Sequence, residues 1–132
     1  MPSTDEMGSG GPGDLARLSI ASDGPAGVVV ATVTGEVDQS NAGALLTSLT
    51  TAVPNTAAGL VVDCTELSYI DSAGVYLLFT LAKRLGAHQQ RLAVAVASGS
   101  HVEQVVELTH LQQLAGVYPS CDDAVAALTQ AE

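Results

Sequence analysis

An aspartate followed by a serine stands where a predicted helix begins. The surrounding residues, 60–78, read LVVDCTELSYIDSAGVYLL, in which an apolar strand runs into a short connection and Asp71-Ser72-Ala73-Gly74 opens the helix. This order places the Ser72 hydroxyl at a helix N-terminus, where free backbone N–H groups and the positive end of the helix dipole favour an anion. Asp and Ser are also strong N-cap residues, so simple helix capping is the competing interpretation of both.

A second polar group follows the preceding predicted strand. In a parallel sheet, the strand end that carries Asp38 faces the same crevice as the start of the helix described above. A cap or an Asx-turn before Ser40 is the alternative interpretation of Asp38, and either Ser40 or Asn41 can cap the helix that comes next. Asp63, at the end of a later strand, is predicted to be structural and to bond nearby backbone N–H groups.

The usual catalytic motifs are missing from the sequence. It has no GxxxxGKS/T phosphate loop, no GxSxG nucleophile elbow and no HExxH zinc motif. The three histidines are isolated, without the carboxylate or carbonyl partners that orient a functional histidine. We therefore expect a protein that is not an enzyme and that has no metal or cofactor of its own. A small enzyme or nucleotide-binding module is the disfavoured alternative.

Strands and helices alternate along the chain. Residues 1–13 are rich in Gly, Ser and Pro and are expected to be a disordered tail, followed by one domain over 14–132. The apolar patterns predict strands at 15–21, 28–33, 60–64, 92–97 and 115–118. Helices are predicted from 41 to 53, from Asp71 or Ser72 to a stop at Gly86, from 100 to 109, and from Asp122 or Asp123 onward.

This alternation predicts an α/β fold in a single domain. Strands separated by helices imply right-handed crossovers and a mostly parallel sheet, here of about five strands packed by about four helices. The first two strands are joined by a short turn, so the first strand is expected to form an antiparallel edge.

The charge balance limits the partners. With 14 acidic and 4 basic residues, the formal net charge is −10, which disfavours nucleic acid and anionic membrane surfaces and favours a protein with a basic surface. No apolar run approaches the roughly 20 residues needed to span a bilayer, and no signal peptide is apparent, so a cytoplasmic protein is expected. Cys64 and Cys121 are expected to be buried or half-buried thiols, with a disulfide and a redox role left open.

Three segments, in the right order over roughly residues 14–130, resemble the STAS-domain family and most closely its bacterial anti-sigma factor antagonists. An apolar strand followed by Asp-Ser-Ala-Gly is similar to the central motif of that family, and the segment 35–38, Gly-Glu-Val-Asp, is similar to a second one. Residues 108–125 resemble a third segment of the family, with a helix, an apolar turn, a short strand and a final helix that begins with acidic residues.

The resemblance implies a binding protein that is controlled by phosphorylation. Its partner would be a kinase-type anti-sigma factor, which binds the ATP, phosphorylates Ser72 and thereby ends the binding, and a phosphoserine phosphatase would reverse the reaction. The unmodified chain, a monomer when free, would release the sigma factor. The residues expected to support the phosphosite or to border the docking face are Asp38, Ser40, Asn41, Asp71, Ala73, Gly74 and Tyr76. The alternative is a STAS accessory subunit that docks on a transporter or a lipid-transport ATPase.

The sequence departs from the family pattern at three positions. Tyr76 is bulky where the family often has a small residue, which puts the shape of the docking surface in question. Ala73 replaces a Ser or Thr, so Ser72 carries the only hydroxyl of the motif. His110 stands where a Gly commonly ends the third helix, and we expect it to adopt the left-handed conformation.

Overall fold

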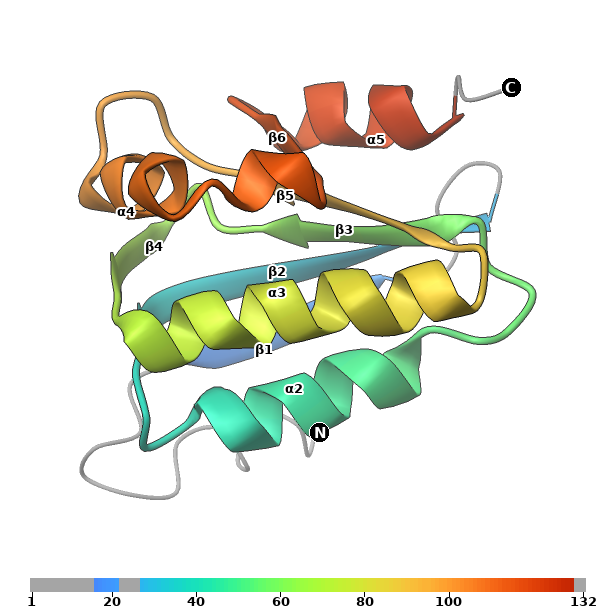
Figure 1. The fold of residues 1–132 in the computed structure, drawn as a ribbon, viewed down its shortest axis with the longest axis horizontal. Helices are drawn as coiled ribbons and strands as arrows, with labels where there is room; N and C mark the ends of the chain where they lie inside the picture. Colours follow the sequence, from blue (N-terminus) through green and yellow to red (C-terminus); the bar gives the residue numbers. More distant parts are fainter. Residues whose placement is uncertain (1–15, 22–26, 130–132) are drawn as a thin grey trace.

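A computed structural model describes residues 16–21 and 27–129 of the chain, so the predicted tail at 1–13 lies outside the described residues. Figure 1 shows the arrangement of the helices and strands. In chain order they are β1 (Arg17–Ala21), β2 (Val28–Val37), α2 (Ala42–Ala52), β3 (Gly59–Asp63), β4 (Leu67–Ile70), α3 (Ser72–Ala87), β5 (Arg91–Ala95), α4 (His101–Thr109), the 3-10 helix η2 (Leu111–Gln113), β6 (Gly116–Tyr118) and α5 (Cys121–Thr129).

The strands form one mixed sheet in the order β1-β2-β3-β5-β6. β1 pairs with β2 in the antiparallel sense, whereas β2, β3, β5 and β6 pair in parallel. The predicted mostly parallel sheet with an antiparallel edge is therefore confirmed. β4 leaves this order and pairs in parallel with the second half of β2.

Helices cover both faces of the sheet, which explains why its inner strands are apolar throughout. α2 and α3 lie on one face and α5 on the other (Figure 1). In β3, Leu60 and Val62 belong to the larger core, which α2, α3 and α4 also enter, whereas Val61 belongs to a smaller core beneath α5. Neighbouring residues of β3 are thus buried in opposite directions.

The structure corrects the sequence analysis at β4. Residues 67–70 were expected to belong to a short connection, but they form a strand beside β2, with Leu67 opposite Gly35 and Ile70 opposite Val37. The register shifts between Gly35 and Glu36, and Gly35 has a φ of 90°, which favours glycine. β2 consequently runs to Val37, beyond the predicted end of its strand.

Two helix boundaries also differ from the expectation. Gly86 does not stop α3, which continues to Ala87; Gln89, with a φ of 63°, adopts the left-handed conformation two residues later. α5 begins at Cys121, where the Ser120 hydroxyl accepts a hydrogen bond from the Asp123 N–H, so the predicted start at Asp122 or Asp123 was late. None of the helices in the described ranges is both long and apolar enough to cross a membrane.

Candidate functional site

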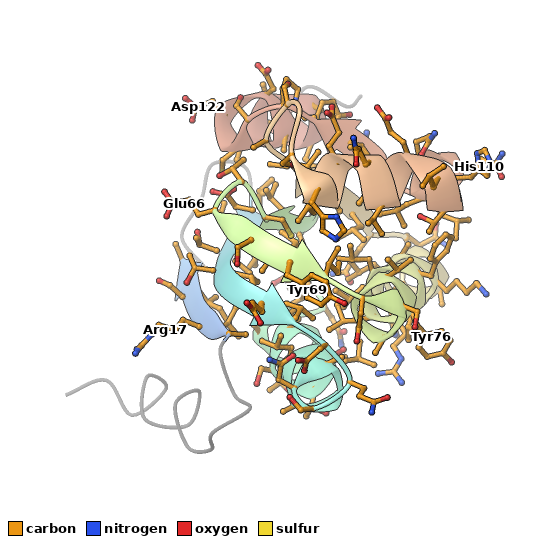
Figure 2. All side chains as sticks on the ribbon, turned by 90° about the vertical axis from the view of Figure 1, so that its left-hand side faces the viewer. Arg17, Glu66, Tyr69, Tyr76, His110 and Asp122 are labelled. Carbon is orange, nitrogen blue, oxygen red and sulfur yellow. The ribbon has the colours of Figure 1, made fainter. Side chains whose placement is uncertain are left out.

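The site lies where β2 and β4 end side by side. Val37 and Ile70 are register partners, and the Asp71 N–H donates to the Val37 carbonyl at 3.2 Å. Asp38 and Asp71 each follow one of these paired residues, so the register brings together two aspartates that are 33 positions apart in sequence. Figure 2 shows this face of the molecule, with Tyr69 of β4 near its centre.

Asp71 caps α3. Its Oδ1 accepts hydrogen bonds from the Ala73 N–H at 2.9 Å and from the Gly74 N–H at 3.2 Å, so two of the unpaired donors of the helix N-terminus are satisfied. The capping interpretation of Asp71 is therefore confirmed. The helix dipole and the carboxylate also stabilise each other at this position.

Ser72 is the first residue of α3 and is exposed. Within residues 16–21 and 27–129, its hydroxyl makes no hydrogen bond, because the capping role belongs to Asp71 alone. The structure thus presents a serine hydroxyl to solvent at a helix start, beside a carboxylate. That arrangement leaves the oxygen accessible to a modifying enzyme.

Gly74 is in the first turn of α3 and is buried. A Cβ at this position would overlap the Ile70 side chain and would come within 3.0 Å of the Val37 side chain. The glycine therefore allows α3 to approach β2 and β4 closely. Gly74 itself is buried, and Ala73 is partly buried against the same core.

The loop after β2 is organised by Asp38. Its Oδ1 accepts from the Ser40 N–H at 2.9 Å and from the Ser40 hydroxyl at 2.6 Å, which is the predicted Asx-turn. These hydrogen bonds from Ser40 lower the pKa of Asp38 from its ordinary value. Asp38 is therefore held as a carboxylate at the edge of the site.

Asn41 occupies the N-cap position of α2, but its side chain makes no capping hydrogen bond. It is buried and reaches back instead: its Oδ1 accepts from the Asp38 N–H at 3.0 Å, and its Nδ2 donates to the Glu36 carbonyl at 3.0 Å. Asn41 thus fixes the shape of the loop from within. Asn41 therefore does not cap α2 through its side chain, which was one of the two caps that the sequence suggested.

Two tyrosines add apolar surface to this face. Tyr76 is 71% exposed on the second turn of α3, and Tyr69 is 41% exposed on β4. The Tyr69 ring stacks on the His101 ring at the start of α4, with centroids 5.5 Å apart and planes within 3° of parallel. Sequence reasoning missed Tyr69 and His101 as members of the site, because β4 was not predicted and the stack joins distant segments.

The sheet separates the two cysteines. Cys64 belongs to the larger core, and burial raises its pKa to about 12. Cys121 packs against the smaller core on the opposite face, and its pKa is raised by burial, by the negative charges of Asp63 and Asp122, and by a hydrogen bond to Asp63. Both thiols are free.

The remaining candidates have structural surroundings. Asp63 accepts from the Thr65 N–H at 3.0 Å and from the Thr65 hydroxyl at 2.7 Å, which confirms its structural role. His110 ends α4 with a φ of 62°, as expected. In the part of the chain that the structure describes, no three His, Cys, Asp or Glu side chains gather in a way that could hold a metal ion.

Comparison with known proteins identifies the family. The model of the STAS domain matches residues 19–124, and the chain belongs to the STAS domain family. A curated protein of Bordetella bronchiseptica, BtrV, which is named as a candidate anti-sigma factor antagonist, is 30% identical over 105 residues, or 80% of this chain and 90% of that protein.

Solved structures show the same fold. An anti-sigma factor antagonist from Mycobacterium paratuberculosis is 25% identical and superposes with a TM-score of 0.77, covering 87% of this chain and 95% of that one. The anti-sigma factor antagonist SpoIIAA in its unphosphorylated form is 19% identical, with a TM-score of 0.70 over 87% of this chain and 98% of its own. The phosphorylated form of SpoIIAA from Bacillus is 18% identical, with a TM-score of 0.61 over 84% and 98%.

Proposed function

We propose that this protein is an anti-sigma factor antagonist whose binding is switched by phosphorylation of Ser72. In its unmodified form it binds a kinase-type anti-sigma factor, and the sigma factor is released. The kinase transfers the γ-phosphoryl group of its own ATP to the Ser72 hydroxyl, and a phosphoserine phosphatase removes the group again. The chain acts through binding alone and needs no cofactor of its own.

The observation that carries this proposal is the state of the Ser72 hydroxyl. It is exposed at the start of α3 and makes no hydrogen bond within the described residues, because Asp71 already caps the helix. A serine used only for capping would give its oxygen to a backbone N–H. The names of the BtrV, mycobacterial and SpoIIAA relatives support the antagonist role, and the two states of SpoIIAA support the switch.

The expected effect of the phosphate is a change of surface. A phosphoserine carries about −1.5 to −2 charges at pH 7. On Ser72 this charge would stand beside the Asp71 carboxylate and near Asp38, and a partner would have to remove water from all of them in order to bind. The main-chain contacts of Asp71 and Gly74 need not change, so we expect the fold to stay intact.

Intact-mass spectrometry with site mapping tests the proposal. The protein and a Ser72→Ala control are incubated with ATP and with each kinase-type anti-sigma factor from the same genome, and complex formation is measured in parallel. One added phosphate on Ser72, absent from the control and accompanied by loss of binding, is the expected result. Binding without modification by any candidate would overturn the switch and favour a STAS subunit that docks on a transporter or a lipid-transport ATPase.

A further inference from the structure

We infer that Tyr76 is the anchoring side chain through which this protein recognises its partner, and that the partner presents an apolar recess bordered by basic side chains. The inference rests on the proposed function and adds to it the residue that carries the binding energy. It concerns a side chain that the fold itself does not use.

Tyr76 is exposed where the fold gives it no role. Its side chain is 71% exposed, whereas the residues next to it in sequence, Val75 and Leu77, point into the core and are buried. Figure 2 shows Tyr76 projecting from α3 at the margin of the face that carries Tyr69. An exposed tyrosine on a rigid helix loses little conformational entropy on binding and brings a large contact area, which is why Tyr is enriched among residues that dominate interfaces.

The position of Tyr76 ties it to the proposed switch. Residues four apart on a helix are surface neighbours, with about 5–6 Å between their Cβ atoms, so Tyr76 stands one turn from Ser72 on the same face of α3. A partner that covers the Ser72 hydroxyl therefore reaches the Tyr76 ring as well. A phosphate on Ser72 would keep such a partner from closing over the ring.

The carboxylates beside Ser72 indicate the chemistry of the partner. Asp38, whose pKa is lowered, and Asp71 are two of the carboxylates at this end of the sheet, and the whole chain has a formal net charge of −10. Lys or Arg side chains at the rim of the recess would complement these carboxylates, and they can also approach the face of a tyrosine ring. The ring itself requires an apolar recess to bury it.

Binding measurements with three variants test the inference. Affinity for the anti-sigma factor that binds the wild-type protein is measured for Tyr76→Ala, Tyr76→Phe and the control Leu108→Ala, which removes another highly exposed apolar side chain, 79% exposed on α4. We expect Tyr76→Ala to raise Kd at least tenfold, or about 1.4 kcal/mol. Tyr76→Phe and Leu108→Ala should stay within about threefold of the wild type, because Phe keeps the ring and Leu108 lies on another helix.

The outcomes separate this inference from the proposed function. An unchanged Kd in Tyr76→Ala, with wild-type and Ser72→Ala binding intact, would overturn the anchoring role and leave the proposed function standing. No binding by the wild type to any kinase-type anti-sigma factor would overturn both. Self-association of the free wild-type chain that disappears in Tyr76→Ala, seen by light scattering, would assign the ring to a second copy and overturn the partner named here.

Discussion

At the scale of single residues, the two aspartates of the site have different uses. The Asp71 carboxylate is engaged by the backbone of α3, whereas Asp38 is held by Ser40 in the loop after β2. Capping therefore leaves Ser72 available, and the Asx-turn keeps a second negative charge close to it. The chemistry of the site depends on which residue does the capping, and here it is the aspartate.

The first prediction concerns the stability of a Ser72→Asp variant. Its side chain replaces an exposed hydroxyl that makes no hydrogen bond within the described residues. Attraction to the helix N-terminus and repulsion from Asp71 oppose each other, so the free energy of unfolding should change by less than about 0.5 kcal/mol. Thermal unfolding should show a shift in Tm below about 3 °C. A large loss of Tm would mean that charge at Ser72 disrupts the fold, contrary to a surface switch.

The second prediction concerns the pKa of Asp38. Removing the side-chain hydrogen bond in Ser40→Ala should raise this pKa toward its ordinary value of 3.8, and NMR titration of the carboxyl carbon measures it. Because the pKa is lower in the folded chain, Asp38 contributes stability above pH 3.8 that is lost as the pH falls through its folded pKa. Ser40→Thr, which keeps a hydroxyl, is the control. An unchanged pKa in Ser40→Ala would show that the hydroxyl hydrogen bond does not set it.

At the scale of helices and strands, the third prediction compares two glycines of α3. A Cβ at Gly74 would overlap Ile70, so Gly74→Ala should lower the free energy of unfolding by about 1–3 kcal/mol. A Cβ at Gly86 would meet nothing within 4 Å, so Gly86→Ala should raise it by about 0.4–1 kcal/mol. Urea unfolding measures both variants. Equal effects would contradict the close approach of α3 to β4.

The comparison of sequence and structure is also clearest at this scale. The apolar composition of β2, β3 and β5 was enough to predict that these strands are buried on both faces. Their parallel pairing agrees with the predicted α/β fold. β4 was not predicted because a strand of four residues carries too little hydrophobic pattern. Its pairing partner is also distant in sequence: Leu67 pairs with Gly35, 32 residues earlier.

The candidate site could likewise be predicted only where it depends on local sequence. Asp71, Ser72 and Asp38 follow from local capping chemistry and from the ends of strands, both of which are visible in sequence. Other features depend on contacts between segments that meet only in the folded chain, so no local sequence pattern predicts them. These features are the hydrogen-bond partners of the Asn41 side chain and the Tyr69–His101 stack. The burial of Gly74 likewise depends on the position of Ile70.

At the scale of the whole molecule, the fourth prediction follows from the net charge of −10. A strongly acidic chain is steered toward a basic partner, so the association rate should fall as the salt concentration rises, while the dissociation rate changes less. Stopped-flow binding between about 50 mM and 500 mM NaCl measures both rates, a range over which the Debye length falls below about 10 Å. An association rate that does not depend on salt would exclude a basic partner surface.

The side position of β4 has a consequence for how motion is distributed in the molecule. The first part of β2 lies between β1 and β3, whereas β4 pairs with the short stretch 35–37 at the end of β2, where the register shifts after Gly35. Local opening of β4 therefore breaks few main-chain hydrogen bonds and leaves the central ladder closed. Amide hydrogen exchange should be faster at residues 67–70 than at 60–63. We therefore expect β4, which leads directly into Ser72, to open at a lower free-energy cost than the central strands β2 and β3.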